Sequence, residues 1–115
     1  MQPMLRAAGL TVPWRWTTDA VTARAMTMVF CYDIERDRTR ARAARLLEAR
    51  AVRVQKSVFE ARLSSAEAGR LFDSVAAVLD ADDSLRMYAL STSGLQRCRV
   101  HGGAPLPEDG DYWLL

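Results

Sequence analysis

Residues 27–33 (TMVFCYD) form a short apolar run that ends abruptly on a carboxylate. Successive side chains of a strand alternate between its two faces. Two sets of side chains would therefore point in opposite directions: Met28, Phe30 and Tyr32 to one side, and Val29, Cys31 and Asp33 to the other. Because both sets are largely apolar, both faces need a cover. The run predicts a strand inside a sheet.

The residues after this strand alternate between helical and strand-like patterns. An alanine-rich stretch predicts a helix from about residue 37 to 50. Residues 51–63 are β-branched and aromatic, but their alternation slips near Lys56 and Ser57. The slip indicates either one long bulged strand or two strands joined by a tight turn.

The second half of the chain repeats the pattern. Ser64 and Glu67 have the spacing of a capping box and predict the start of a second helix. The core face expected for that helix consists of Ala68, Leu71, Phe72, Val75, Val78 and Leu79. Residues 85–90 predict a strand, and residues 95–102 predict a shorter one. The order predicts an α+β fold, the ferredoxin-like β-α-β-β-α-β arrangement with an extra C-terminal strand.

Helices cover only one face of such a sheet, so the face that carries Val29 and Cys31 would remain open in a single chain. An open apolar face predicts a homodimer, most simply a twofold one. The 115 residues suit one domain over 26–103. Residues 1–25 are interpreted as an N-terminal extension or a misassigned start, and residues 104–115 as a C-terminal tail or strand.

Positive charge is concentrated in residues 36–56, which hold eight basic and two acidic side chains. Arg38, Arg42 and Arg45 have the i, i+4, i+7 spacing of one helical stripe. Such a stripe is typical of a surface that binds phosphates without reading base sequence. A solvated helix face in an arginine-rich chain is the alternative.

Asp33 is the candidate for chemistry. Twofold pairing of the open faces would bring two copies of its carboxylate together, which raises a pKa or recruits a cation. Mg²⁺ is bound by one or two carboxylates and keeps several waters, and a bound Mg²⁺ can activate water against a phosphodiester. The alternative is that Asp33 caps the following helix or pairs with a nearby arginine.

Other classes of function have little support. The chain has two cysteines and one histidine, with no CxxC motif, which makes a zinc site improbable. The sequence has neither a Ser/His/Asp set nor a glycine-rich phosphate loop. No apolar run approaches the roughly 20 residues that span a membrane. With no signal-peptide pattern at its start, the chain is expected to be cytoplasmic.

Together these residues resemble the CRISPR-associated Cas-two family, the small dimeric subunit of the spacer-acquisition machinery. The resemblance covers roughly residues 28–115. It rests on "YDI" at 32–34, the arginines after it, "RVQKSVFEARLS" at 53–64 and the ending "GGAPLPEDGDYWLL". It implies roles for individual positions. Asp33 matches an aspartate implicated in magnesium binding at the dimer interface, and Ser57 lies in a turn where the two chains approach. The other matching positions are Tyr32, Arg40, Arg42, Arg53 and Phe59.

The resemblance also implies partners. Family members form homodimers that bridge two dimers of the Cas-one integrase and hold double-stranded DNA, the prespacer and the repeat. The implied nucleic-acid-binding residues are Arg38, Arg40, Arg42, Arg45 and Arg53. Some members are described as metal-dependent endonucleases, and related toxins are ribonucleases; both remain alternatives. Arg36 occupies a position where the family often has an acid, which argues against a competent nuclease. The acidic tail is interpreted as a Cas-one contact or a swapped strand.

Overall fold

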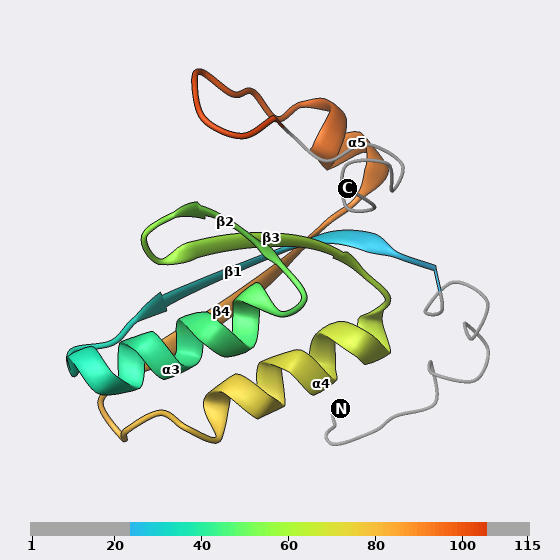
Figure 1. The fold of residues 1–115 in the computed structure, drawn as a ribbon. Coiled ribbons are helices and arrows are strands. Elements are labelled where there is room, and N and C mark those ends of the chain that lie inside the picture. Colours follow the sequence, from blue (N-terminus) through green and yellow to red (C-terminus); the bar gives the residue numbers. More distant parts are fainter. Residues whose placement is uncertain (1–23, 106–115) are drawn as a thin grey trace.

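The computed structural model describes residues 24–105. Its elements follow in the order β1 (Met26–Asp33), α3 (Asp37–Glu48), β2 (Val52–Gln55), β3 (Val58–Leu63), α4 (Ser65–Ala76), β4 (Ser84–Leu90) and α5 (Thr92–Gln96). The succession up to β4 confirms the predicted β-α-β-β-α-β order (Figure 1). Nearly all of the predicted N-terminal extension (1–25) and of the C-terminal tail (104–115) lies outside the described residues.

The four strands form one antiparallel sheet in the order β2-β3-β1-β4. The apolar run identified first in the sequence is therefore a central strand, paired with β3 on one side and β4 on the other. Figure 1 shows α3 and α4 side by side on one face of this sheet, with α5 away from that helical layer. The chain has the α+β, ferredoxin-like fold.

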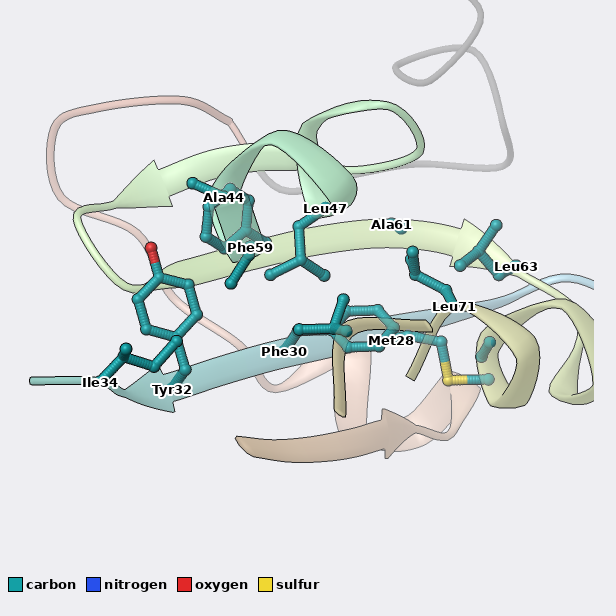
Figure 2. Packing of buried hydrophobic residues seen from close by; sticks show 13 residues of the cluster. Met28, Phe30, Tyr32, Ile34, Ala44, Leu47, Phe59, Ala61, Leu63 and Leu71 are labelled. Carbon is teal, nitrogen blue, oxygen red and sulfur yellow. The ribbon is translucent and has the colours of Figure 1, made fainter. Parts of the chain in front are cut away.

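The core lies between the sheet and the two long helices. Met28, Phe30 and Tyr32 are buried and project from one side of β1, as the alternation predicted (Figure 2). They pack with Phe59 from β3 and Leu47 from α3, both of which are fully buried. Three large side chains from alternate positions of one strand thus hold two layers together, which stabilises the fold through buried apolar area.

Residues 51–63 form two strands joined by a turn at Lys56 and Ser57, and not one long bulged strand. The register of β2 against β3 also shifts between Arg53 and Gln55, so β2 carries a local irregularity as well. The turn places Ser57 beside the end of β1, where its carbonyl accepts a hydrogen bond from the Tyr32 N–H at 3.1 Å.

The predicted capping box is present at the start of α4. The Glu67 N–H donates to the Ser64 hydroxyl at 3.2 Å, and the Ser64 N–H donates to the Glu67 carboxylate at 2.9 Å. The Ser64 backbone N–H, followed by the Ser64 hydroxyl, lowers the pKa of Glu67 below its usual value. Two N–H groups that an open helix end leaves unpaired are satisfied in this way.

The strand predicted over residues 95–102 is wrong. The structure has the short helix α5 at Thr92–Gln96 and no strand between there and residue 105. The reason is local: the Ser91 hydroxyl accepts a hydrogen bond from the Gly94 N–H at 3.0 Å and starts a helical turn. That turn includes the first two residues of the predicted strand, and Val100 beyond it is exposed.

The second face of the sheet is less covered than the first within residues 24–105. Val29 and Cys31 are only partly buried there, and Tyr88 on β4 is 49% exposed. Glu60 lies between Val29 and Val52 in the sheet register, and burial among these neighbours raises its pKa. This pattern is what the sequence predicted for an open face; the homodimer inferred from it stays a prediction. Within the described part of the chain, no helix has the length and apolar character needed to cross a membrane.

Candidate metal and nucleic-acid site

Asp33 is the last residue of β1 and is exposed. Its Cα is paired with that of Ser84 on β4, so the sheet holds its backbone. The carboxylate has no hydrogen bond or ion pair with any residue from 24 to 105. The N-cap position of α3 is Arg36, and no side chain caps that helix end. Among the described residues, Asp33 is therefore neither a helix cap nor half of an ion pair, and its carboxylate is available to a ligand.

Tyr32, the residue before Asp33, fastens the end of β1 to the turn between β2 and β3. Its N–H donates to the Ser57 carbonyl at 3.1 Å, and its hydroxyl donates to the Lys56 carbonyl at 3.2 Å. Both bonds reach the same turn, one through the main chain and one through the side chain. Ser57 therefore lies beside the Tyr32–Asp33 segment of its own chain, and its expected place where two chains approach stays a prediction.

Arg53 joins the same cluster from β2. Its Nε donates to the Lys56 carbonyl at 3.1 Å, and its Nη2 donates to the Tyr32 hydroxyl at 3.4 Å. The guanidinium lies 5.3 Å from the centroid of the Phe59 ring, within the range of a cation–π contact. The rings of Tyr32 and Phe59 are 5.9 Å apart. Four residues that the sequence singled out separately, Tyr32, Arg53, Ser57 and Phe59, thus form one cluster.

Arg40 holds the segment that follows Asp33. Its Nη1 donates to the carbonyls of Ile34 and Glu35 at 2.9 and 3.1 Å. Its Nη2 forms an ion pair with Asp37, one helical turn earlier in α3. Arg40 therefore ties the β1–α3 connection to the helix, and much of its donor capacity is already used inside the chain.

Arg38, Arg42 and Arg45 differ from Arg40 and Arg53. All three are exposed on α3, opposite the buried Ala43 and Leu47 that face the core. No hydrogen bond or ion pair joins their side chains to the residues between 24 and 105. The predicted arginine set therefore falls into two groups. The stripe on α3 makes no side-chain bond within residues 24–105, whereas Arg40 and Arg53 bond to the chain itself.

A hollow of about 420 Å³ lies beside this cluster, and it is lined by Arg40, Arg53, Val54, Gln55, Lys56 and Ser57. Three of these side chains are cationic, but Arg40 and Arg53 direct most of their donors at oxygens of the chain itself. The Lys56 side chain is exposed. The hollow and the Asp33 segment are connected through the Tyr32 hydroxyl, which bonds to the Lys56 carbonyl.

An acidic loop before β4 was missed by sequence reasoning. Asp83 accepts a hydrogen bond from the Glu35 N–H at 3.5 Å, and the Asp80 carboxylate lies 3.8 Å from the Arg36 guanidinium. The loop includes the segment "DADDS", residues 80–84, in which the sequence shows no recognisable motif. The fold brings it to the segment that follows Asp33, and nothing in its local pattern signals that contact, because residues 35 and 83 are 48 positions apart.

The described residues of one chain offer little for a metal. Between residues 24 and 105, no group of three or more His, Cys, Asp or Glu side chains is placed to hold an ion. Asp33 alone fits a Mg²⁺ that keeps most of its waters, because that ion accepts one carboxylate and a hydrated shell. A tighter site requires a second carboxylate from outside residues 24–105, and the predicted dimer would supply one.

Comparison with known proteins gives consistent results. Residues 26–98 match the family model described as CRISPR associated protein Cas2, the Cas-two family that the sequence resembles. A Synechocystis protein named CRISPR-associated endoribonuclease Cas2 3 is 40% identical over 79 residues, which are 68% of this chain and 86% of that protein.

Two solved structures extend the similarity to the fold. Cas2 of Streptococcus pyogenes, in a crystal structure at pH 6.5, has a TM-score of 0.58 and 26% identity; the match covers 67% of this chain and all of that one. A chain of a partial Cas6-RT-Cas1–Cas2 complex has a TM-score of 0.59 and 26% identity, covering 72% of this chain and 92% of that one. The similarity thus includes a protein found in a complex with Cas1, the Cas-one protein.

Proposed function

This chain belongs to the CRISPR-associated Cas2 family, and from that premise we propose that it acts in spacer acquisition as a dimeric adaptor that bridges Cas1 and holds double-stranded DNA. A similar chain occurs in a complex that contains Cas1, which supports the adaptation role and the partner. The observation that carries the DNA-holding part is the arginine stripe on α3.

The arginine stripe, Arg38, Arg42 and Arg45, suits a phosphate backbone for two reasons. Its guanidinium groups are exposed and make no bond within residues 24–105, so no internal contact has to break before they bind phosphate. The i, i+4, i+7 spacing keeps them on one side of the helix, where they can meet a row of charges. Contacts with phosphate carry no base code, so binding is independent of sequence.

The proposed adaptor is a dimer. The open sheet face carries Val29, Cys31 and Tyr88 beside the charged Glu60 and Arg86, and burial against a second copy would stabilise the apolar part of this surface. A twofold axis through this face would present two copies of the α3 stripe on one particle. Two stripes hold one duplex more firmly than one, because the second binding step is intramolecular.

Duplex binding at a series of salt concentrations tests the adaptor. The stripe predicts sequence-independent binding. The logarithm of the binding constant should fall linearly with the logarithm of the salt concentration, and the size of that slope should decrease by about 0.9 for each phosphate contact removed. Arg42→Gln should lower the slope and reduce spacer integration in a mixture with Cas1. Arg70→Gln, on the exposed side of α4, is the matched control and should leave both unchanged. An unchanged slope in Arg42→Gln would contradict the proposal.

The contact with Cas1 is assigned to the acidic tail, residues 104–115, nearly all of which lie outside the described part. Removing residues 104–115 and measuring co-purification with Cas1 separates docking from simple packing. Loss of Cas1 with an intact dimer supports a docking role for the tail. Retention of Cas1 would assign the contact to another surface.

A second function, a magnesium-dependent endonuclease, is favoured by a different observation. The Asp33 carboxylate is exposed and unbonded within the described chain, while its backbone is held by β4, so it can accept a hydrated Mg²⁺ without losing an internal contact. Such an ion supplies a more acidic bound water at neutral pH. Asp33→Asn should abolish cleavage of RNA or DNA while the dimer persists. Cleavage that survives this change would exclude Asp33 as the catalytic residue.

A further inference from the structure

Arg53 lies in β2, and it differs from the arginine stripe because its guanidinium is bonded to the chain. The group donates to the Lys56 carbonyl and to the Tyr32 hydroxyl, and it lies 3.6 Å from the Glu48 carboxylate. From this geometry we propose that Arg53 is a positioning residue, which fixes the segment carrying Asp33 by acting through Tyr32 and does not bind phosphate. The inference deepens the proposed function at Asp33 and rests on it.

The donors of Arg53 are directed at the chain itself. Arginine carries five N–H donors in a planar fork. In this protein Nε, Nη1 and Nη2 are each directed at an oxygen of the chain: the Lys56 carbonyl, the Glu48 carboxylate and the Tyr32 hydroxyl. The flat face of the group lies over the Phe59 ring. Three of the five N–H donors of Arg53 are thus directed at oxygens of the chain, whereas Arg42 and Arg45 have no such partner among the described residues.

The contacts of Arg53 fix the backbone on either side of the β2–β3 turn. Arg53 and Tyr32 meet at one acceptor, the Lys56 carbonyl, and the Tyr32 N–H bonds to the neighbouring Ser57 carbonyl. The turn between β2 and β3 and the end of β1 are thus fastened as one unit. Asp33 is the next residue, and its other side is paired with Ser84. The backbone of Asp33 is held from both sides, while its carboxylate makes no bond within residues 24–105.

The position of the Asp33 carboxylate affects the rate of any reaction in which it takes part. A catalytic carboxylate loses about 10²-fold in rate when a reacting group is misplaced by roughly 1 Å. A residue that fixes the backbone next to Asp33 therefore affects catalysis without touching substrate. Lysine cannot replace arginine in this role, because a compact ammonium cannot hydrogen-bond the Lys56 carbonyl and the Tyr32 hydroxyl, pair with Glu48 and lie over the Phe59 ring at once. A simple phosphate contact, in contrast, tolerates lysine.

The salt dependence of duplex binding separates positioning from phosphate contact. If Arg53 is a positioning residue, Arg53→Gln should bind duplex with the wild-type salt slope. If Arg53 contacts phosphate, the salt slope of this variant should be smaller by about 0.9. Arg42→Gln is the matched control, since it removes one positive charge from the exposed stripe and should show the smaller slope. A reduced slope in Arg53→Gln overturns the inference.

Amide hydrogen exchange of the full-length dimer tests positioning directly. Arg53→Gln, Arg53→Lys and Tyr32→Phe should each speed exchange of the Tyr32 amide by about tenfold, because each removes a hydrogen bond from the unit that holds it. The double variant Tyr32→Phe/Arg53→Gln should exchange no faster than the faster single variant, because the two groups act together. Wild-type exchange in Arg53→Gln, or additive effects in the double variant, overturns the inference.

The cleavage assay links the inference to the proposed endonuclease and keeps the two distinguishable. Where wild-type protein cleaves, Arg53→Lys should lower kcat with little change in KM, and wild-type kcat in this variant overturns the inference. Where wild-type protein does not cleave, the endonuclease proposal fails, whereas amide exchange and the salt slope still decide whether Arg53 positions the Asp33 segment.

Discussion

Tyr32 and Arg53 donate hydrogen bonds to the same acceptor, the carbonyl oxygen of Lys56, at 3.2 and 3.1 Å. The two residues come from different strands, 21 positions apart in the sequence, and their side chains also lie 3.4 Å from each other. This shared acceptor ties the end of the central strand to the β2–β3 turn. It explains how Asp33, with a carboxylate unbonded within residues 24–105, can still have a fixed backbone.

Truncation of Phe59 tests the packing beneath this cluster. Phe59 is fully buried, contacts the Tyr32 ring and lies under the Arg53 guanidinium. Phe59→Ala should lower the free energy of unfolding by about 3–5 kcal/mol, because it removes apolar contacts and leaves a cavity. Urea denaturation measures the change. Val100→Ala is the control. Because Val100 is 49% exposed, this variant should lose less than about 0.5 kcal/mol of unfolding free energy.

The α4 capping box gives a pH-dependent prediction. Ser64→Ala should cost about 1 kcal/mol of unfolding free energy at neutral pH, because it removes the hydroxyl that accepts from the Glu67 N–H.

The pKa of Glu67 lies below its ordinary value of 4.5, chiefly because the Ser64 backbone N–H donates to its carboxylate. The Ser64 hydroxyl and Arg50 lower it further. The stabilisation from ionised Glu67 is therefore fully present above pH 4.5 and is lost as pH falls through the lowered folded-state pKa. Glu67→Ala should remove this part of the acid sensitivity in chemical denaturation curves. An identical pH dependence in wild type and variant would contradict the assignment.

Glu60 should behave in the opposite way. Burial raises its pKa above 4.5, so the folded state keeps the proton to a higher pH than the unfolded state does. Stability therefore falls as pH rises from 4.5 through the raised folded-state pKa. Glu60→Gln should raise the melting temperature at pH 7, and the gain should disappear below pH 4.5. A gain that persists in acid would show that the charge of Glu60 is not its cause.

Charge placed on the open sheet face should prevent dimerisation. Val29 is partly buried and lies in the centre of that face, between Glu60 and Tyr88 in the register. Val29→Asp would bury an unpaired carboxylate in the proposed interface, at a cost of several kcal/mol, so light scattering should report monomers. Val100→Asp, at an exposed position beyond α5, should remain dimeric. A dimeric Val29→Asp protein would place the interface elsewhere.

Magnesium should stabilise the wild-type dimer through Asp33. A shared ion binds only the folded, paired state, so its addition should raise the melting temperature by mass action. Asp33→Asn should remove this magnesium effect. In the absence of magnesium the same change should alter stability by less than about 0.5 kcal/mol, because the carboxylate has no partner in the described chain. An equal magnesium response in both proteins would exclude Asp33 as a ligand.

The amino-acid sequence by itself determined the order of the elements up to β4. The alternation in residues 27–33 predicted which side of β1 is buried, and the Ser64–Glu67 spacing predicted the start of α4. These features were predictable because they depend on neighbours in the chain. The strand predicted at 95–102 failed for a local reason: the Ser91 cap starts a helical turn, which outweighs the apolar alternation beyond it.

Only the tertiary structure decided how the arginines differ. Arg40, Arg42 and Arg53 have the same chemistry in the sequence, yet Arg40 and Arg53 bond to the chain, whereas Arg42 makes no bond within residues 24–105. The partners that make this difference are carbonyl oxygens and a hydroxyl supplied by segments such as Tyr32 and Lys56. A carbonyl oxygen is present at every residue and carries no sequence signal, so which of them meets a guanidinium follows from how the sheet and helices pack.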